Sequence, residues 1–272
     1  MSANVSAIPI KRSVNVRAIA LPVEHGSWGF VFEPLLAALL VAFSPSAIWI
    51  ALTVVGAFLT RQPLKIYLND LKAKRSLPQT AVALKYALGY GALFLAGLAG
   101  SLVFVRFDAF LPFLFILPLA VYQIYCDASR RSRELLPELT GAVAISSSVA
   151  VIALAADWTP AAAAALWAIF VARLIPSILY VRNRLRLEKG KEFSSAMPVA
   201  ANLAALIFLI FLTRIGFGSL LTVAMFAVLF GRAAVGLSPY RRKVKAMRIG
   251  VWEVVYGSLT AISVVLGYYL KI

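Results

Sequence analysis

The chain has 272 residues, of which 62% are hydrophobic and only 14% are charged. A soluble domain of this length carries about a quarter charged residues, so the composition excludes a soluble globular protein and predicts lipid as the solvent. The net charge of +16 comes with no nucleic-acid motif, so we assign it to loops beside anionic headgroups and expect no nucleic-acid partner. One cysteine and one histidine exclude an intrachain disulfide and argue against a soft-metal site.

Apolar segments long enough to approach the roughly 20 residues of a spanning helix recur along the chain. They predict an all-α fold, a polytopic membrane bundle of about nine transmembrane helices. Residues 1–24 are predicted to be a cytoplasmic tail that ends in an interfacial helix, and residues 25–272 a single transmembrane domain. The expected helices, in chain order, are 26–43, 46–61, 81–105, 109–126, 138–156, 160–181, 197–214, 217–236 and 250–270.

The connecting segments alternate sharply in charge. The tail and the segments 62–80, 127–137, 182–196 and 237–249, with their edges, hold 22 of the 27 Lys and Arg residues, and the opposite side holds only three. Positive charge accumulates in cytoplasmic loops. We therefore expect a bacterial cytoplasmic (inner) membrane protein with its N-terminus in the cytoplasm and its C-terminus periplasmic or extracellular.

Some ionisable residues fall inside predicted helices, where charge is costly and usually functional. Glu33 lies in the first helix, Arg173 in the sixth and Arg232 in the eighth. Two interpretations stay open: a polar cavity within the bundle, or a structural ion pair that fixes helix packing.

The stretch from Glu24 to Glu33 holds the only histidine, His25, among glycines that let a ligand approach closely. His25 and Glu33 are candidate catalytic groups, and His25 is suited to act as a general base or a phosphate partner. The alternative is an interfacial anchor with Trp28 at headgroup level.

Basic residues next to oxygen ligands follow the second and fourth helices. Arg61 and Lys65 are candidates for binding phosphate, and Asn69 and Asp70 for binding Mg²⁺. In the second group, Asp127 is a candidate catalytic residue and Arg131 a phosphate ligand. The alternatives are an ordinary basic loop with a helix cap for the first group and a salt-bridged turn for the second.

The sixth helix carries a further anion-binding candidate. Arg173, Ser177 and Tyr180 share one helical face at steps of four and three, and Arg182 continues past the interface. Arg, Ser and Tyr side chains beside a proline-opened backbone suit an anion. The alternative is a ring of arginines that binds lipid headgroups.

Several of these segments together resemble the YwiC-like family, from about residue 24 to residue 190. The resemblance is carried by residues 25–30 with Glu33-Pro34, by residues 61–65, by Asp127 with residues 131–138, and by Arg173 with residues 176–180. This family is poorly characterised, so the resemblance implies a membrane protein and little about its function.

A more distant resemblance is to UbiA-type intramembrane prenyltransferases, which have nine helices and a cytoplasm-facing cavity. Tyr125, the Arg130-Arg131 pair and Leu136-Pro137 are similar to their loop pattern, and Asn69-Asp70 stands where their first Asp-rich motif begins. That resemblance implies a diphosphate ligand and Mg²⁺ as cofactor. The next two Asp positions of the motif are Ala73 and Leu77 here, and the segment after the sixth helix has no such motif.

Three hypotheses follow. The first is a cytoplasm-facing polar cavity for an anionic diphosphate or lipid headgroup, in a divergent prenyltransferase-like enzyme with an isoprenoid or phospholipid ligand. The second is an ion-coupled transporter, with Glu33, Arg173 and Arg232 at its site. The third is a lipid-binding or assembly protein without catalysis, whose protein partners the sequence does not name.

Overall fold

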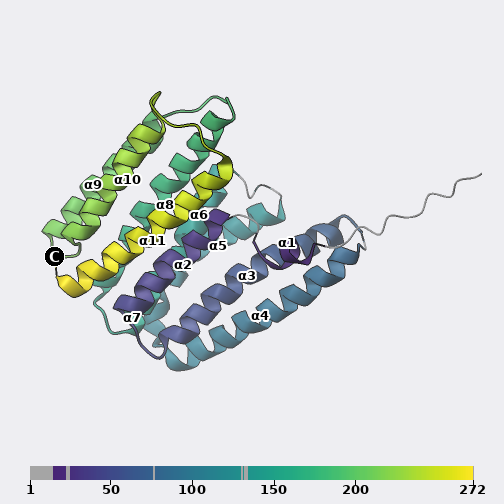
Figure 1. Ribbon diagram of the computed structural model, residues 1–272. Coiled ribbons are helices and arrows are strands. Elements are labelled where there is room, and N and C mark those ends of the chain that lie inside the picture. Colours follow the sequence, from purple (N-terminus) through teal and green to yellow (C-terminus); the bar gives the residue numbers. More distant parts are fainter. Residues whose placement is uncertain (1–14, 23–24, 76, 130, 132–133, 272) are drawn as a thin grey trace, which may run out of the picture.

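The computed structural model describes residues 15–22, 25–75, 77–129, 131 and 134–271, with the side chains of residues 25–27 left out. The described residues form helices joined by loops and turns, with no strands among them, which confirms the predicted all-α fold (Figure 1). In chain order the elements are α1 (Val16–Ala20), α2 (His25–Val41), α3 (Ala47–Lys72), α4 (Pro78–Phe104), η1 (Phe107–Phe110), α5 (Leu111–Ala128), α6 (Leu135–Ser146), α7 (Ser148–Ala155), α8 (Pro160–Glu188), α9 (Ala196–Arg214), α10 (Leu220–Gly236) and α11 (Ala246–Leu270).

Nine segments of the described chain correspond to the nine predicted helices. Seven are long and apolar enough to cross a bilayer, with η1–α5 and α6–α7 each forming one span. The apolar stretches Trp28–Val41 of α2 and Leu220–Gly236 of α10 are shorter. Large apolar side chains face outward on many helices, among them Phe115 at 80% exposure and Val103 at 73%. An apolar surface of this extent is unfavourable in water. The chain is therefore a multi-pass membrane protein.

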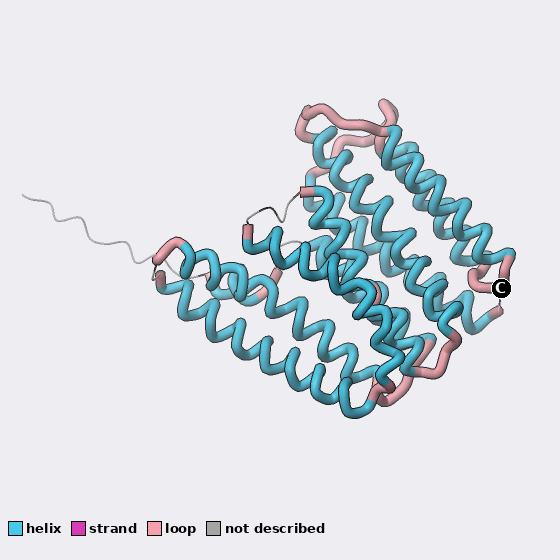
Figure 2. Tube along the Cα trace, turned by 180° about the vertical axis from the view of Figure 1, so that it is seen from behind, coloured by secondary structure: helices cyan, strands magenta, loops and turns pink. Residues whose placement is uncertain are grey.

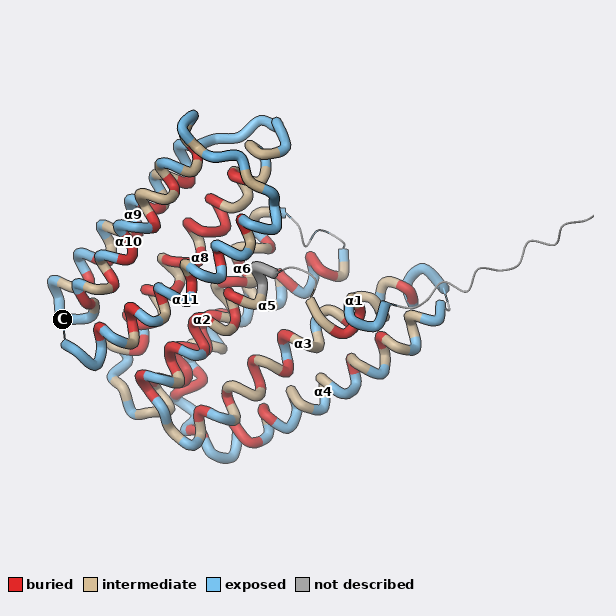
Figure 3. Tube along the Cα trace, in the orientation of Figure 1, coloured by how far each residue is buried: buried red, intermediate tan, exposed pale blue. Residues whose placement is uncertain are grey.

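The helices form an antiparallel bundle with α3 and α4 at one side and α9 and α10 at the other (Figure 1). Between these pairs lie α2, α6, α8 and α11, and the view from behind shows the same order of helices across the bundle (Figure 2). Buried residues concentrate on α8 and on the faces that neighbouring helices turn toward one another (Figure 3). A helix that is buried nearly all round can carry charged groups away from lipid.

Two helices extend well beyond the apolar stretches that predicted them. Helix α3 continues to Lys72 instead of ending at residue 61, and α8 continues to Glu188 instead of residue 181. Hydropathy detects only the part of a helix in hydrocarbon, whereas Lys, Arg, Gln, Glu and Leu all favour the helix in water as well. The predicted loops 62–80 and 182–196 are therefore mostly helix.

The fifth predicted span is interrupted at Ser147, between α6 and α7. Three consecutive serine hydroxyls donate to carbonyls three residues earlier: Ser146 to Val143, Ser147 to Ala144 and Ser148 to Ile145, at 2.6–2.9 Å. Such local side-chain bonds compete with helix hydrogen bonds and bend helices. Helices α6 and α7 together still form one membrane span.

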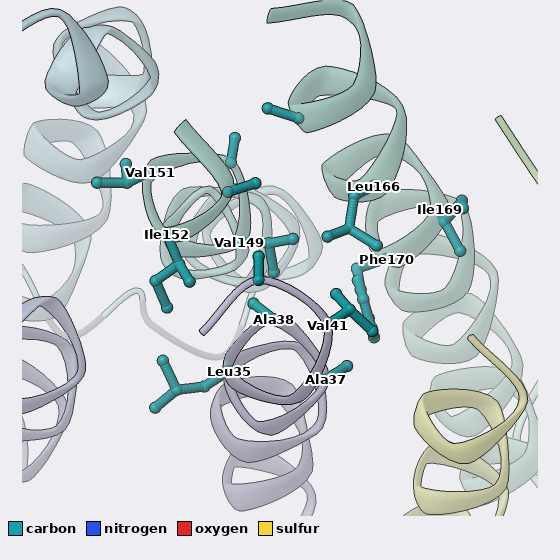
Figure 4. Close-up of a cluster of buried hydrophobic side chains, with 14 of the residues drawn as sticks. Leu35, Ala37, Ala38, Val41, Val149, Val151, Ile152, Leu166, Ile169 and Phe170 are labelled. Carbon is teal, nitrogen blue, oxygen red and sulfur yellow. The ribbon is translucent and has the colours of Figure 1, made fainter. Parts of the chain in front are cut away.

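The central apolar core joins α2, α7 and α8 (Figure 4). Ala37 and Ala38 let α2 approach closely, while Ile152 and Phe170 fill the space beside it, each with no exposed surface. In lipid, such close packing of small against large side chains is the main attraction between helices.

Glycines bring α3 and α4 into backbone contact. A Cβ on Gly97 would lie 2.5 Å from the backbone nitrogen of Thr53, and a Cβ on Gly56 would lie 2.5 Å from that of Phe94. Gly97 therefore permits the close approach of α4 to α3. Gly89 has no such role, because a Cβ there would meet nothing within 4 Å.

We expect the Gly97→Ala variant to lower the free energy of unfolding by about 1–3 kcal/mol, because the added methyl group forces the α3 backbone to move. Gly89→Ala, on the same helix, is the matched control and should be neutral or slightly stabilising. Unfolding of both variants in mixed detergent micelles measures the difference. Equal stability of the two variants would contradict the close contact.

Candidate functional site

A large cavity lies among helices α2, α3, α4, α5, α6, α8 and α11. Its volume is about 1150 Å³, slightly above the range usual for small-molecule sites. Most of the lining is apolar and includes five aromatic side chains, those of Phe30, Phe58, Phe94, Phe110 and Phe113. The cavity therefore suits a hydrocarbon chain through most of its extent.

The polar lining residues come from helix ends that meet on one side of the bundle. They lie on the C-terminal parts of α3, α5 and α8 and on the first turn of α6, and the polar end consists of Arg61, Lys65, Asn69, Lys72, Gln123, Asp127, Glu138 and Arg182. Outside this end, the one charged residue of the described lining is Glu253 on α11, which is paired with Arg173 and Arg232. The cavity is thus amphipathic, with hydrocarbon and polar surfaces at separate ends.

An ion pair between Arg61 and Asp127 joins α3 to α5 at this polar end. The guanidinium donates from Nε to Oδ2 at 2.6 Å and from Nη2 to Oδ1 at 2.9 Å, which is the two-bond geometry that fixes an arginine most firmly. Lys65 Nζ lies 3.8 Å from the same carboxylate. Turned so that its oxygen faces Arg61, the Gln123 amide accepts from Nη2 at 2.6 Å.

A second ion pair joins α8 to α6. Arg182 Nη1 donates to Glu138 Oε2 at 2.7 Å, and Lys72 Nζ donates to the Ala128 carbonyl at 3.2 Å. The described polar end therefore carries four cationic side chains and two carboxylates, which leaves it net positive.

A separate charge network lies within the bundle beside the cavity. Arg173 has no exposed side-chain surface, and it donates from Nη1 to Glu253 Oε1 at 2.7 Å and from Nη2 to the Glu253 carbonyl at 3.1 Å. Arg232 Nη1 donates to the other Glu253 oxygen at 2.6 Å. Glu253 thus holds two buried guanidinium groups, one on α8 and one on α10.

Three further contacts complete this network. The Arg232 guanidinium lies 4.3 Å from the ring centroid of Tyr180 and 4.6 Å from that of Tyr256, in cation–π contact with both. Glu33 Oε2 lies 3.5 Å from Arg173 Nη2. Two arginines and two glutamates give no net formal charge, which is how buried charges are tolerated in lipid.

A comparison with protein families finds a match in the first half of the chain. The family model described as YwiC-like protein matches residues 21–153. Over these residues the chain is similar to that family. No curated protein and no solved structure matches the chain.

The YwiC-like region runs from the segment before α2 through α7. It supplies every polar residue of the cavity end except Arg182, which lies on α8. Arg173, Arg232 and Glu253 come from the part of the chain after the region, whereas Glu33 lies within it. The predicted resemblance reached residue 190, so it extended past the YwiC-like match into α8.

The structure brings several predicted site residues to the polar end of the cavity. Arg61, Lys65, Asn69, Asp127 and Arg182 all line it. They come from three helices and from positions 121 residues apart in the sequence. Their roles in binding phosphate or in catalysis stay predictions.

Other predicted residues lie in the buried network. Arg173 contacts Ser177, whose hydroxyl accepts from Nη1, and Tyr180 faces Arg232. Glu33, predicted as catalytic, also belongs to this network. The helical face predicted from Arg173, Ser177 and Tyr180 therefore faces buried counter-charges rather than the polar end of the cavity.

Arg131 lies outside both groups. Its guanidinium donates to both oxygens of Glu134 at 2.8 Å, and it does not line the cavity. These hydrogen bonds hold the pKa of Glu134, in the loop before α6, below its usual value. The side chain of His25 and all of Arg130 lie outside the described residues, so the prediction for His25 stays as it was.

The two predicted metal ligands face different surroundings. Asn69 lines the cavity, whereas the Asp70 carboxylate accepts from Thr80 Oγ1 at 2.8 Å and from Gln79 Nε2 at 3.2 Å, at the start of α4. Among the described residues there is no group of three or more His, Cys, Asp or Glu side chains that would hold a metal ion. Binding of Mg²⁺ by Asn69 and Asp70 therefore stays a prediction.

Sequence reasoning missed the residue that organises the buried network. Glu253 lies in the last predicted helix and is 4% exposed. It carried the same signal as Glu33 and Arg173, namely a charged residue within a span. Gln123 and Lys72 were also missed, because a single amide or lysine near a helix end is common in any membrane protein.

Proposed function

We propose that the cavity binds an amphipathic ligand, with an anionic headgroup at the polar end and a hydrocarbon chain among the aromatic residues. The observation that carries this proposal is the separation of charge and hydrocarbon within one cavity of about 1150 Å³. A soluble anion would leave the aromatic part empty, and a purely apolar lipid would leave Arg61 and Arg182 facing hydrocarbon, which is costly.

The net positive charge of the polar end supports an anion over a cation or a neutral headgroup. Asp127 holds Arg61 in one orientation, and Glu138 does the same for Arg182. Phosphate oxygens accept hydrogen bonds from arginine forks and lysine ammonium groups that are held in place in this way. Diphosphate and phospholipid headgroups share this chemistry.

We further propose that the polar end faces the cytoplasm of a bacterium. The basic helix ends Lys72–Arg75, Arg182–Lys191 and Arg241–Arg248 lie at the same end of the bundle as the polar cavity residues, and Arg106, Arg214 and Lys271 lie at the other. This distribution is typical of cytoplasmic and external faces respectively. A headgroup would then enter from the cytoplasmic leaflet.

Binding of three probes to the protein in nanodiscs of neutral lipid tests the proposal. We expect geranylgeranyl diphosphate to bind at least about a hundredfold tighter than geranylgeraniol or inorganic pyrophosphate, because each part supplies several kcal/mol that the other lacks. Dioleoyl phosphatidate serves as a fourth probe that separates a phospholipid from an isoprenoid. Equal binding of the diphosphate and the alcohol would contradict an anion site.

A bulky side chain in the apolar part provides the matched test in the protein. Ala57 lines the cavity on α3, so Ala57→Trp is expected to weaken binding of geranylgeranyl diphosphate by at least about tenfold through lost space for the chain. Ala96→Trp, at an exposed position of α4 that does not line the cavity, is the control. Unchanged binding in Ala57→Trp would place the ligand elsewhere.

Prenyl transfer is a narrower proposal on the same cavity. Incubation of the protein with labelled prenyl diphosphates and candidate acceptors measures it, and release of diphosphate would support a UbiA-like enzyme. Tight binding without release would instead support a lipid-binding protein without catalysis.

Ion-coupled transport is the competing proposal, and the buried network of Glu33, Arg173, Arg232 and Glu253 is the observation that favours it. Reconstituted proteoliposomes distinguish the two. Ligand-dependent proton or sodium movement across the bilayer would support transport, whereas binding without such movement would support the cavity proposal.

A further inference from the structure

A second hollow lies between α2 and α11. It has a volume of about 450 Å³, and its lining is apolar apart from Glu33 and Ser258. Glu33 lines this groove and not the large cavity, whereas Glu253 lines the cavity and not the groove. Arg173 contacts both carboxylates. The charge network therefore lies between two separate hollows.

Glu33 is the member of the network with the fewest partners. Its side chain is 6% exposed, and Oε2 is buried without a hydrogen bond within the described structure. Arg173 Nη2 lies 3.5 Å away and donates instead to the Glu253 carbonyl. Arg232 donates to Glu253. A buried carboxylate that lacks a close donor is costly, so this position favours a ligand that supplies one.

The backbone is shaped around this carboxylate. A Cβ on Gly29 would lie 2.5 Å from Glu33 Oε1, and a Cβ on Gly257 would overlap the carboxylate itself. Glycine at both positions leaves the space that the carboxylate occupies between α2 and α11. Any larger residue at position 257 would displace Glu33 from the groove.

The charges of the buried network favour a neutral hydrogen-bond donor to Glu33 over a cationic one. The two arginines and two glutamates already cancel, so a bound cation would leave one uncompensated positive charge in apolar surroundings. A hydroxyl group donates a hydrogen bond and adds no charge. Along α2, Leu36 and Leu40 continue the groove for roughly 10 Å beyond Glu33, and Ile262 and Leu266 face it from α11.

We propose that this groove is a second ligand site, which binds the hydroxyl group of a lipid-like alcohol at Glu33 and its alkyl chain between α2 and α11. The site goes beyond the function proposed for the large cavity and does not depend on the ligand bound there. A hydrogen bond donated to the Glu33 carboxylate distinguishes the occupant from the bulk acyl chains that cover any lipid-facing groove.

Photo-labelling of the full-length protein in nanodiscs tests the site. The probe is 1-decanol that carries a diazirine on its chain, and the control probe is the corresponding methyl ether, which cannot donate. We expect peptides of α2 and α11 to be labelled about tenfold more by the alcohol than by the ether, because a hydrogen bond to a charged group contributes at least that factor. Equal labelling by the two probes would overturn the proposal.

Variants give a second readout. Ala261→Phe fills the groove without altering a charged residue, and it should abolish the preference for the alcohol. Glu33→Leu should lower labelling by the alcohol about tenfold, to the level of the ether. The variant protein should still elute as a monodisperse species. Ala204→Phe, at an exposed position on α9, is the matched control and should label normally. Full labelling of Ala261→Phe, or cross-links between two copies through α2 and α11, would overturn the site.

Discussion

Replacement of Glu253 by alanine is expected to lower the free energy of unfolding by about 3–5 kcal/mol, the cost of leaving a buried charge without its partner. Arg173 and Arg232 both donate to this carboxylate, at 2.7 and 2.6 Å. Both guanidinium groups are more than nine-tenths buried, so neither reaches water when the carboxylate is lost. Unfolding in mixed detergent micelles measures the change.

Two further variants separate the charge of Glu253 from its size. Glu253→Gln keeps the side chain nearly the same size and one accepting oxygen but removes the charge, so its loss of stability should be smaller than that of the alanine variant. Glu192→Ala removes an exposed glutamate from the segment after α8 and should change stability by less than about 0.5 kcal/mol. If Glu253→Ala behaves like Glu192→Ala, the network does not stabilise the bundle.

Reversal of the charge at Lys65 is expected to weaken binding of geranylgeranyl diphosphate by about a hundredfold. The variant loses one charge-assisted hydrogen bond, which contributes about 1.5–3 kcal/mol, and it places a second carboxylate beside Asp127. Lys65 is the suitable position because its Nζ lies 3.8 Å from Asp127 and lines the cavity, whereas Arg61 is held by two short hydrogen bonds.

The matched control for Lys65→Glu is Lys85→Glu. Lys85 lies on α4, is exposed and does not line the cavity. Both variants change the net charge equally, so a general effect of charge on the nanodisc surface would appear in both. Equal weakening in the two variants would show that the polar end of the cavity does not hold the headgroup.

The number and order of the spans were predictable because hydrocarbon imposes a single requirement, a run of apolar residues of sufficient length. Helix ends were less predictable. Residues 62–72 of α3 and 182–188 of α8 continue the helices outside hydrocarbon, where charged residues are as good helix formers as apolar ones. A hydropathy profile does not detect such an extension.

The site was predictable only in part, for a related reason. Charged residues at helix ends and within spans identified Arg61, Asp127, Arg173 and Arg182 as unusual, but sequence spacing did not say which of them meet. The structure separates them into a cavity end and a buried network. Asp70 shows the same limit, because its contacts with Thr80 and Gln79 depend on the start of α4 lying beside the end of α3.

Native mass spectrometry of the protein released from its own membrane tests the central claim, an amphipathic cavity that holds an anionic lipid. We expect one bound phosphate-bearing lipid for each chain, which is lost in Ala57→Trp and retained in Ala96→Trp. A chain without such a lipid, or the same bound lipid in both variants, would contradict it.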